Sequence, residues 1–167
     1  MDHALYKIRL ALQADVKTMV TLSRQKRQSY ARVQPQFWRP ALHADKIQAQ
    51  WFESLLSQPD YLSLIGENEN ENENENQIRG FIIGRLITAP EVYDPGVLTL
   101  MIDDFCVEKQ ELWPSLGKKM IEKIREMAKQ KGAVQILVVC GHHDEPKQQF
   151  LKNMGLSIVS EWYREAL

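Results

Sequence analysis

The stretch from 97 to 140 constrains the fold most, because it joins two apolar, strand-like runs through one amphipathic helix. The runs 97–107 and 134–140 are rich in apolar and β-branched side chains, which favour strands. Between them, apolar side chains recur at helical spacing from Leu116, lysine and arginine occupy the opposite face, and Gly132 follows as a stop. The order predicts a βαβ crossover, and the continuous run 134–140 predicts a strand buried on both faces.

The rest of the chain adds further strands and helices around this unit. Period-two alternation predicts strands, apolar side chains at helical spacing predict helices, and Pro and Gly separate them. Further strands are expected over 6–12, 61–66, 80–87 and 156–163. One helix is expected to begin at Asp15, and two more are expected over 44–57 and 145–153. This order predicts an α/β (α+β) fold with a mixed, mostly antiparallel central sheet flanked by helices.

A tract of five consecutive Glu-Asn dipeptides occupies residues 67–76. It has no apolar side chain and carries five negative charges, so it cannot form a packed core. Because expected strands flank it, we interpret it as a hairpin loop within one domain spanning 1–167. Closing a longer flexible loop costs little free energy. A cation-binding role for the tract is the alternative.

Charge and composition exclude several classes of function. The net charge of −1 gives no basic field that would recruit nucleic acid or an anionic membrane. The longest apolar runs are far too short to span a bilayer, and residues 1–12 lack the pattern of a signal peptide. Cys106 and Cys140 lie in apolar runs, which favours reduced thiols. We therefore expect a cytoplasmic protein without nucleic-acid or membrane partners.

The junction between Val107 and Lys118 has the chemistry of an anion site. A strand that enters a helix presents unpaired N–H groups and the positive end of the helix dipole. Ser115 and Gly117 are small enough to let a ligand approach the backbone, and Lys118 adds positive charge. An ordinary crossover turn that binds nothing is the alternative.

Two segments resemble motifs of the GNAT family of acetyl-CoA-dependent N-acetyltransferases. The first is Ile102-Asp-Asp-Phe-Cys-Val107, with Gly117 ten positions after the valine and followed by Lys-Lys-Met-Ile. The second runs from Asp144 to Gly155 and contains Phe150. The element order is similar over nearly the whole chain. The resemblance implies an acyl-CoA N-acyltransferase-like fold, acetyl-CoA as cosubstrate, and direct attack of an amine on the thioester in a ternary complex.

The resemblance also implies which residues bind the cofactor. Loop N–H groups before the helix would hold the pyrophosphate of coenzyme A, and an N–H at the end of the preceding strand would polarise the thioester carbonyl. The residues so assigned are Phe105, Cys106, Val107, Leu112, Trp113, Ser115, Leu116, Gly117, Lys118, Asp144 and Phe150. Asp144 is also expected to cap the helix that follows it. No metal is expected, because the run 142–144 lacks the spacing of a metal site.

Asp103, Asp104 and His142 are the candidate catalytic residues. Asp103 matches a position where some family members carry a Glu proposed as general base, and the adjacent carboxylate is expected to raise its pKa. Strand alternation would send Asp103 and Asp104 to opposite faces. A structural cap or ion pair is the alternative for either one. His142 follows the strand beside the expected cleft, and histidine titrates near neutral pH; a polar turn is its alternative.

Tyr30, Phe37 and Trp38 are the expected acceptor residues, because the family shapes its acceptor pocket with the two early helices. Five cations make this part of the chain locally basic, namely Arg24, Lys26, Arg27, Arg32 and Arg39. Such charge suits a small-molecule or peptide amine that also carries a carboxylate or phosphate. The alternative is a solvated helix face with aromatic packing.

A non-catalytic member of the same fold, which binds coenzyme A or another ligand as a sensor or interaction module, is the alternative function. Leu112 stands where Gln or Arg is usual, Pro114 has no N–H for a phosphate, and Leu151 stands where a proton-donating Tyr is common. A nucleotide-binding protein would need a Gly-rich fingerprint that the chain lacks. Only twelve residues follow Gly155, and the resulting sheet edge favours either a homodimer or an edge protected within the chain.

Overall fold

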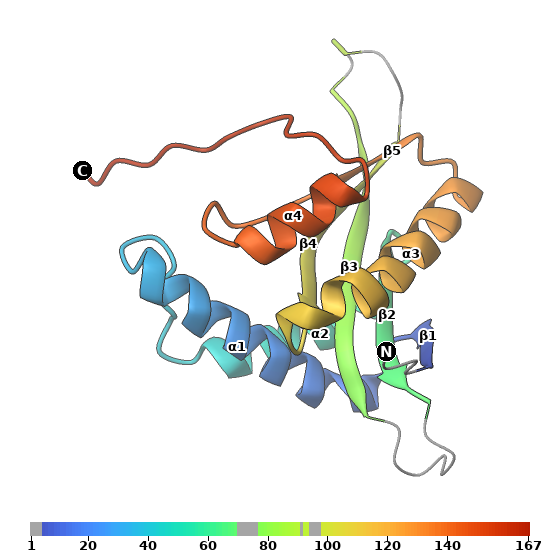
Figure 1. The fold of residues 1–167 in the computed structure, drawn as a ribbon, viewed down its shortest axis with the longest axis horizontal. Coiled ribbons are helices and arrows are strands. Elements are labelled where there is room, and N and C mark those ends of the chain that lie inside the picture. Colours follow the sequence, from blue (N-terminus) through green and yellow to red (C-terminus); the bar gives the residue numbers. More distant parts are fainter. Residues whose placement is uncertain (1–4, 70–76, 91, 94–97) are drawn as a thin grey trace.

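The structure is a computed structural model that describes residues 5–69, 77–90, 92–93 and 98–167 (Figure 1). Within these residues, five strands form one sheet in the order β1-β2-β3-β4-β5. They are β1 (Tyr6–Leu10), β2 (Tyr61–Asn68), β3 (Ile78–Thr88), β4 (Leu98–Val107) and β5 (Gln135–Val138). The first four pair antiparallel and β5 pairs parallel with β4. The predicted mixed, mostly antiparallel sheet is therefore confirmed.

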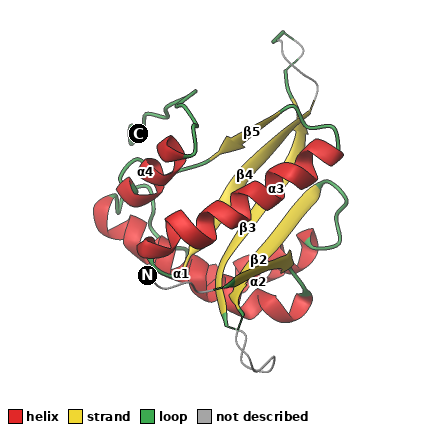
Figure 2. Ribbon diagram, turned by 45° about the vertical axis from the view of Figure 1, so that its right-hand side comes forward, coloured by secondary structure: helices red, strands yellow, loops and turns green. Residues whose placement is uncertain are grey.

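Four α-helices of the described chain cover the two faces of this sheet. They are α1 (Val16–Val33), α2 (Ala44–Leu55), α3 (Lys118–Gln130) and α4 (Glu145–Asn153). Figure 2 shows α3 crossing one face, with α1 and α2 behind the other. In the part of the chain that the structure describes, none of the helices is both long and apolar enough for a membrane span.

The sheet separates two hydrophobic cores. On one face, Ile82 and Ile102 lie in a core with Met120, Ile121 and Ile124 of α3. Fully burying one such side chain contributes about 1.5–3 kcal/mol, which is why the apolar stripe of α3 is a strong sequence signal. The second core lies under α1 and α2 and includes Met19, Phe52, Leu55, Ile65, Phe81 and Ile83.

β5 and the C-terminal segment differ from the prediction. The run 134–140 forms a strand of only four residues, and Val139 beside it is 42% exposed, so burial on both faces was wrong. The reason is its position at the end of the sheet. The expected strand 156–163 does not form, and Trp162 and Tyr163 are 88% and 90% exposed. The segment instead leaves the body of the molecule as an irregular trace (Figure 1).

The Glu-Asn tract begins inside β2 rather than after it. Glu67 is buried and forms an ion pair with Arg9, whose guanidinium also binds Asp15 at 2.7 and 2.9 Å. This network joins β1, β2 and the start of α1, so the first glutamate of the tract is structural. β2 and β3 pair antiparallel, as expected for the two strands of a hairpin. Residues 70–76 of the tract lie outside the described residues.

Candidate active site

β4 carries a one-residue β-bulge at Asp103. Asp104 and Ile102 pair with consecutive residues of β3, so Asp103 is an extra residue between them. A bulge places two residues opposite one partner and interrupts the alternation of side chains. As a result Ile102 and Phe105, three positions apart, both belong to the core under α3 and α4. The expectation that alternation sends the two aspartates to opposite faces was therefore wrong.

The charges of Asp103 and Asp104 both affect the pKa of Lys26 on α1. The Lys26 ammonium lies 2.6 Å from Oδ1 of Asp104 in a half-buried ion pair, as one alternative for this residue predicted. Burial opposes the charged form of Lys26, but the acidic groups of Cys106, Asp104 and Asp103 raise the pKa of Lys26 above its ordinary value. Partial burial and then the charge of Asp104 raise the pKa of Asp103. At the bulge, the carboxylate of Asp104 is therefore ion-paired, whereas that of Asp103 takes up a proton more readily than an ordinary aspartate.

β4 and β5 separate after Ile102, and we call this divergence the β4–β5 split. The last bond between them runs from the N–H of Val139 to the carbonyl of Ile102, at 2.8 Å. The N–H of Glu108 donates to β3. Because backbone groups alternate along an antiparallel ladder, those of Phe105 and Val107 face away from β3, toward the split. An extended ligand would find strand-like hydrogen-bonding groups there.

The side chain of Lys147, from the first turn of α4, reaches into the β4–β5 split. It is 2% exposed, and its ammonium donates to the carbonyls of Phe105 at 3.2 Å and Val139 at 3.0 Å. The rings of Phe105 and Trp113 have their centroids 5.6 and 5.8 Å from this nitrogen, within the range of cation–π attraction. Burial first, and the positive charge of Lys26 second, lower the pKa of Lys147.

Sequence reasoning missed Lys147. A lysine in a short, mostly polar helix is normally solvated. The available signal was spacing, because Lys147 precedes the apolar Phe150 and Leu151 by three and four positions and so shares their helix face. All three side chains are buried.

The loop before α3 buries several residues that were assigned to the cofactor. Residues 113–117 form a π-helical turn that continues into α3. The ring of Trp113 stacks on Phe150 with centroids 5.1 Å apart, and Leu116 is fully buried. A Cβ on Gly117 would lie 2.8 Å from the Trp113 ring. The small size of Gly117 therefore serves internal packing in this structure, while Ser115 and Lys118 are exposed at the start of the helix.

Tyr30 connects α1 to the turn between β5 and α4. Its hydroxyl donates to Oδ2 of Asp144 at 2.6 Å and accepts from the N–H of Gly141 at 3.3 Å. Burial and then the bond to Asp144 raise the pKa of Tyr30 above its ordinary value. Asp144 also accepts from the N–H of Lys147, which confirms the predicted cap of α4. A residue expected on the acceptor side thus touches one expected on the cofactor side.

The remaining site predictions fall on the surface or near it. Trp38 packs edge-on against Tyr30 and Phe37, with centroids 5.2 and 4.6 Å away, so the three predicted acceptor residues form one aromatic cluster. His142 is exposed on the turn before α4, and the centroids of its ring and the His143 ring lie 4.9 Å apart. The structure therefore brings Tyr30 and Asp144 together and leaves His142 facing solvent.

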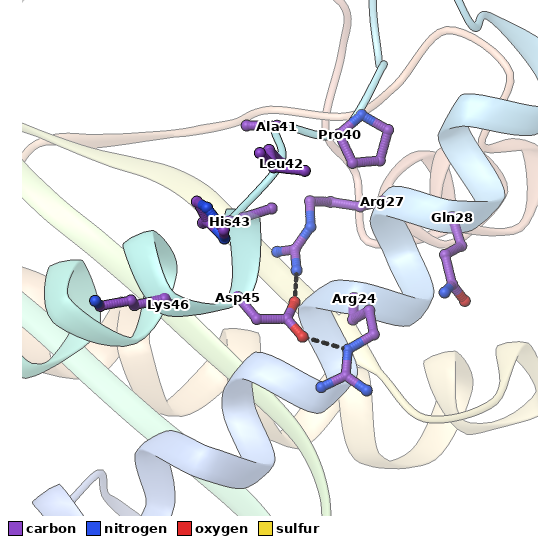
Figure 3. Close-up of a pocket in the computed structure, with 10 residues that line it drawn as sticks. Arg24, Arg27, Gln28, Pro40, Ala41, Leu42, His43, Asp45 and Lys46 are labelled. Atoms are coloured by element: carbon purple, nitrogen blue, oxygen red, sulfur yellow. Dashed lines mark hydrogen bonds and ion pairs between the residues drawn. The ribbon is translucent and has the colours of Figure 1, made fainter.

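A pocket of about 400 Å³ lies between α1 and the segment leading into α2 (Figure 3). Arg24 and Arg27 line it, and both pair with Asp45, with 2.6 Å between Nε of Arg24 and Oδ2. The carboxylate offsets much of the positive charge that the sequence places in this region. Lys26 binds Asp104 of β4 instead, so the basic residues of α1 do not form a single anion site.

No family model and no curated protein matches this sequence. Solved structures match it by fold. A tetramutant of the BH1408 protein from Bacillus halodurans has a TM-score of 0.80 and 17% identity, covering 96% of this chain and 99% of that one. A predicted acetyltransferase with acetyl-CoA from Clostridium acetobutylicum has a TM-score of 0.71 and 18% identity, covering 97% and 96%. The glucosamine-6-phosphate N-acetyltransferase from Arabidopsis thaliana has a TM-score of 0.66 and 19% identity, covering 97% and 98%. This chain therefore adopts the fold of these three structures, the acyl-CoA N-acyltransferase fold that the GNAT resemblance led us to expect.

Proposed function

We propose that the protein is an acetyl-CoA-dependent N-acetyltransferase. The observation that carries this proposal is the β4–β5 split, where the backbone of Phe105 and Val107 faces away from β3. The ammonium of Lys147 donates to the carbonyl of Phe105, and because it is a donor it does not occupy a backbone N–H group. In this proposal a backbone N–H there polarises the thioester carbonyl, as preorganised donors do in acyl transfer. The fold shared with a structure holding acetyl-CoA supports the same function.

The residues at the start of α3 fit the phosphates of coenzyme A in part. Ser115 and Lys118 are exposed at the N-terminal end of the helix, where the dipole favours an anion. Pro114 offers no N–H, and Trp113 and Gly117 are buried. We therefore assign the phosphates to Ser115 and Lys118, and the acyl arm to the split.

Asp103 is the general base in this proposal. A carboxylate with a raised pKa is better matched to taking a proton from an ammonium acceptor, directly or through one water. Asp104, the next residue, is held in an ion pair with Lys26. The amine nitrogen then attacks the thioester carbon directly. Burial raises the pKa of the Cys140 thiol to about 11, so this cysteine stays protonated and is a poor nucleophile.

The acceptor is an amine on a small molecule or peptide in this proposal. The aromatic cluster of Tyr30, Phe37 and Trp38 packs at the end of α1. The hydroxyl of Tyr30 reaches the turn that precedes α4. Phe37 is half exposed and so is available to a ligand. Both cysteines are free, which fits the reducing cytoplasm where acetyl-CoA is supplied.

Calorimetric titration with acetyl-CoA, followed by a thiol-release assay on pooled amines, tests the proposal. We expect binding and amine-dependent release of coenzyme A. Asp103→Asn should lower kcat/KM by about 100-fold, the lower range for general-base catalysis. Asp60→Asn, which removes a surface carboxylate bound to Arg85, is the matched control and should leave the rate unchanged. Absence of binding at millimolar acetyl-CoA would refute the proposal, and an unchanged Asp103→Asn rate would refute the base.

A non-catalytic ligand-binding module is the second candidate. The packing of Gly117 against Trp113 favours it, because that glycine offers no open approach to the backbone of the loop. Binding of acetyl-CoA without turnover on any amine would support this candidate over the enzyme.

A further inference from the structure

The ammonium of Lys147 is a buried cation whose described hydrogen bonds all go to neutral groups. Its partners are the carbonyls of Phe105 and Val139. The two nearby aspartates are engaged elsewhere: Asp144 accepts from a tyrosine hydroxyl and a backbone N–H, and Asp104 pairs with a lysine of α1. A buried charge without an opposite charge is costly. The site is therefore complementary to negative charge that forms close to this nitrogen.

The position of the ammonium ties it to the reacting atoms of the proposed transfer. It is bonded to Phe105, whose backbone faces the β4–β5 split, so an acyl thioester that pairs with this segment lies beside it. The two carbonyl bonds use two of the three ammonium protons. Leu151, one turn later on the same buried face of α4, has no proton to give.

We propose that Lys147 donates a proton to the sulfur that leaves when the thioester is cleaved. This inference rests on the proposed function. The acceptor nitrogen bonds to the carbonyl carbon, the carbon–sulfur bond breaks, and the sulfur leaves with the bonding electron pair and takes a proton from Nζ. Asp103 takes the proton that the amine loses, and Lys147 regains its own from solvent. The products are an amide and a thiol, so atoms and charge balance.

The groups around Lys147 favour such a donor. Burial is the main cause that lowers the pKa of Lys147, and Lys26 on α1 lowers it further. Cys106 of β4, Cys140 after β5 and Asp144 before α4 act in the opposite direction. A lowered pKa brings the ammonium closer to the pKa of a thiol, which eases proton transfer between them.

The test compares coenzyme A with desulfo-coenzyme A, which lacks the sulfur. Calorimetry across a pH series gives the affinity of each compound for the wild type, Lys147→Met and Lys147→Gln. Above about pH 8.5, the ordinary pKa of a thiol, the wild type should bind coenzyme A up to about tenfold more tightly than the desulfo compound, because lowering the pKa of the bound thiol by one unit then corresponds to a tenfold preference. Both variants should lose this preference, since neither carries the charge.

Turnover gives a second readout on the same variants. Lys147→Met should lower kcat by about 100-fold with little change in KM, as expected for loss of a general acid. Lys152→Met, on the exposed face of α4, is the matched control and should behave as the wild type. Adding Leu151→Tyr to Lys147→Met should restore part of kcat, because it supplies a proton donor one turn away.

The outcomes separate the two proposals. If Lys147→Met and Lys147→Gln keep the preference for coenzyme A and the wild-type kcat, Lys147 is not the donor and the proposed function stands. Tighter binding of both compounds with unchanged kcat would show that Lys147 only obstructs the split, and would also overturn the inference. If the wild type binds neither compound, the proposed function fails and takes the inference with it. Lys147→Met should fold, because the described hydrogen bonds of the ammonium go to carbonyls, so the change leaves no partner charge buried and uncompensated.

Discussion

Removing the hydroxyl of Tyr30 should loosen the contact between α1 and the β5–α4 turn. The hydroxyl donates to the Asp144 carboxylate at 2.6 Å, and hydrogen bonds to charged groups contribute about 1.5–3 kcal/mol. It also accepts from the buried N–H of Gly141 at 3.3 Å, worth about 0.5–1 kcal/mol at that length. Tyr30→Phe should therefore lower the free energy of unfolding by about 2–4 kcal/mol. For a chain of this size that corresponds to a fall in Tm of about 4–16 °C.

Urea unfolding, followed by circular dichroism, measures the loss as a shift of the midpoint at constant slope. A double-mutant cycle with Asp144→Ala isolates the contact, and we expect a coupling of about 1–2 kcal/mol between the two positions. A loss below about 0.5 kcal/mol, the size of an ordinary surface substitution, would refute the reasoning. So would additive single-variant losses, because they would mean that the hydroxyl and the carboxylate do not interact in solution.

Three further predictions follow from the same structure. Gly117→Ala should destabilise the protein by about 1–3 kcal/mol in urea unfolding, because the new Cβ would lie 2.8 Å from the ring of Trp113; an unchanged midpoint would contradict that packing. Asp15→Ala should cost about 3 kcal/mol by thermal denaturation, since it leaves the partly buried guanidinium of Arg9 with one partner fewer. The pKa of Asp103 is raised by burial and by its neighbour, so the folded state holds this proton at higher pH than the unfolded chain does. Stability should therefore fall as pH rises from about 4 through the folded pKa, and Asp103→Asn should flatten that part of the stability curve.

The elements that the sequence predicts well are those whose signals are local. α4 begins and ends where expected, because Asp144 caps it and Gly155 follows its end with a positive φ of 82°. The stripe of α3 is equally clear, since one helix face carries nearly all its apolar side chains. The expected strand 156–163 does not form. Alternating apolar and polar side chains favour an extended chain, but a strand forms only where a neighbouring strand offers backbone hydrogen-bond partners.

The site depends on contacts that local patterns do not encode. The bond from Tyr30 to Asp144 joins residues 114 positions apart, so no spacing in the sequence predicts it. Two adjacent carboxylates in an apolar strand did indicate that the pKa of Asp103 is raised. No sequence pattern indicated the bulge that places both carboxylates beside α1. The role of Lys147 was not predictable from its neighbours in the sequence, because its burial depends on the divergence of β4 and β5.

The bulge has a consequence for how β4 tolerates changes in length. Ile102 and Phe105 point to the same core with two residues between them, whereas a regular strand needs an odd number there. Deleting Asp103 would therefore leave a regular ladder in which every core residue keeps its side of the sheet. Deleting Thr99 instead would exchange the buried and outward positions at one end of the strand. We therefore expect one residue of β4 to be dispensable for folding, and it is the one that we assign to the chemistry.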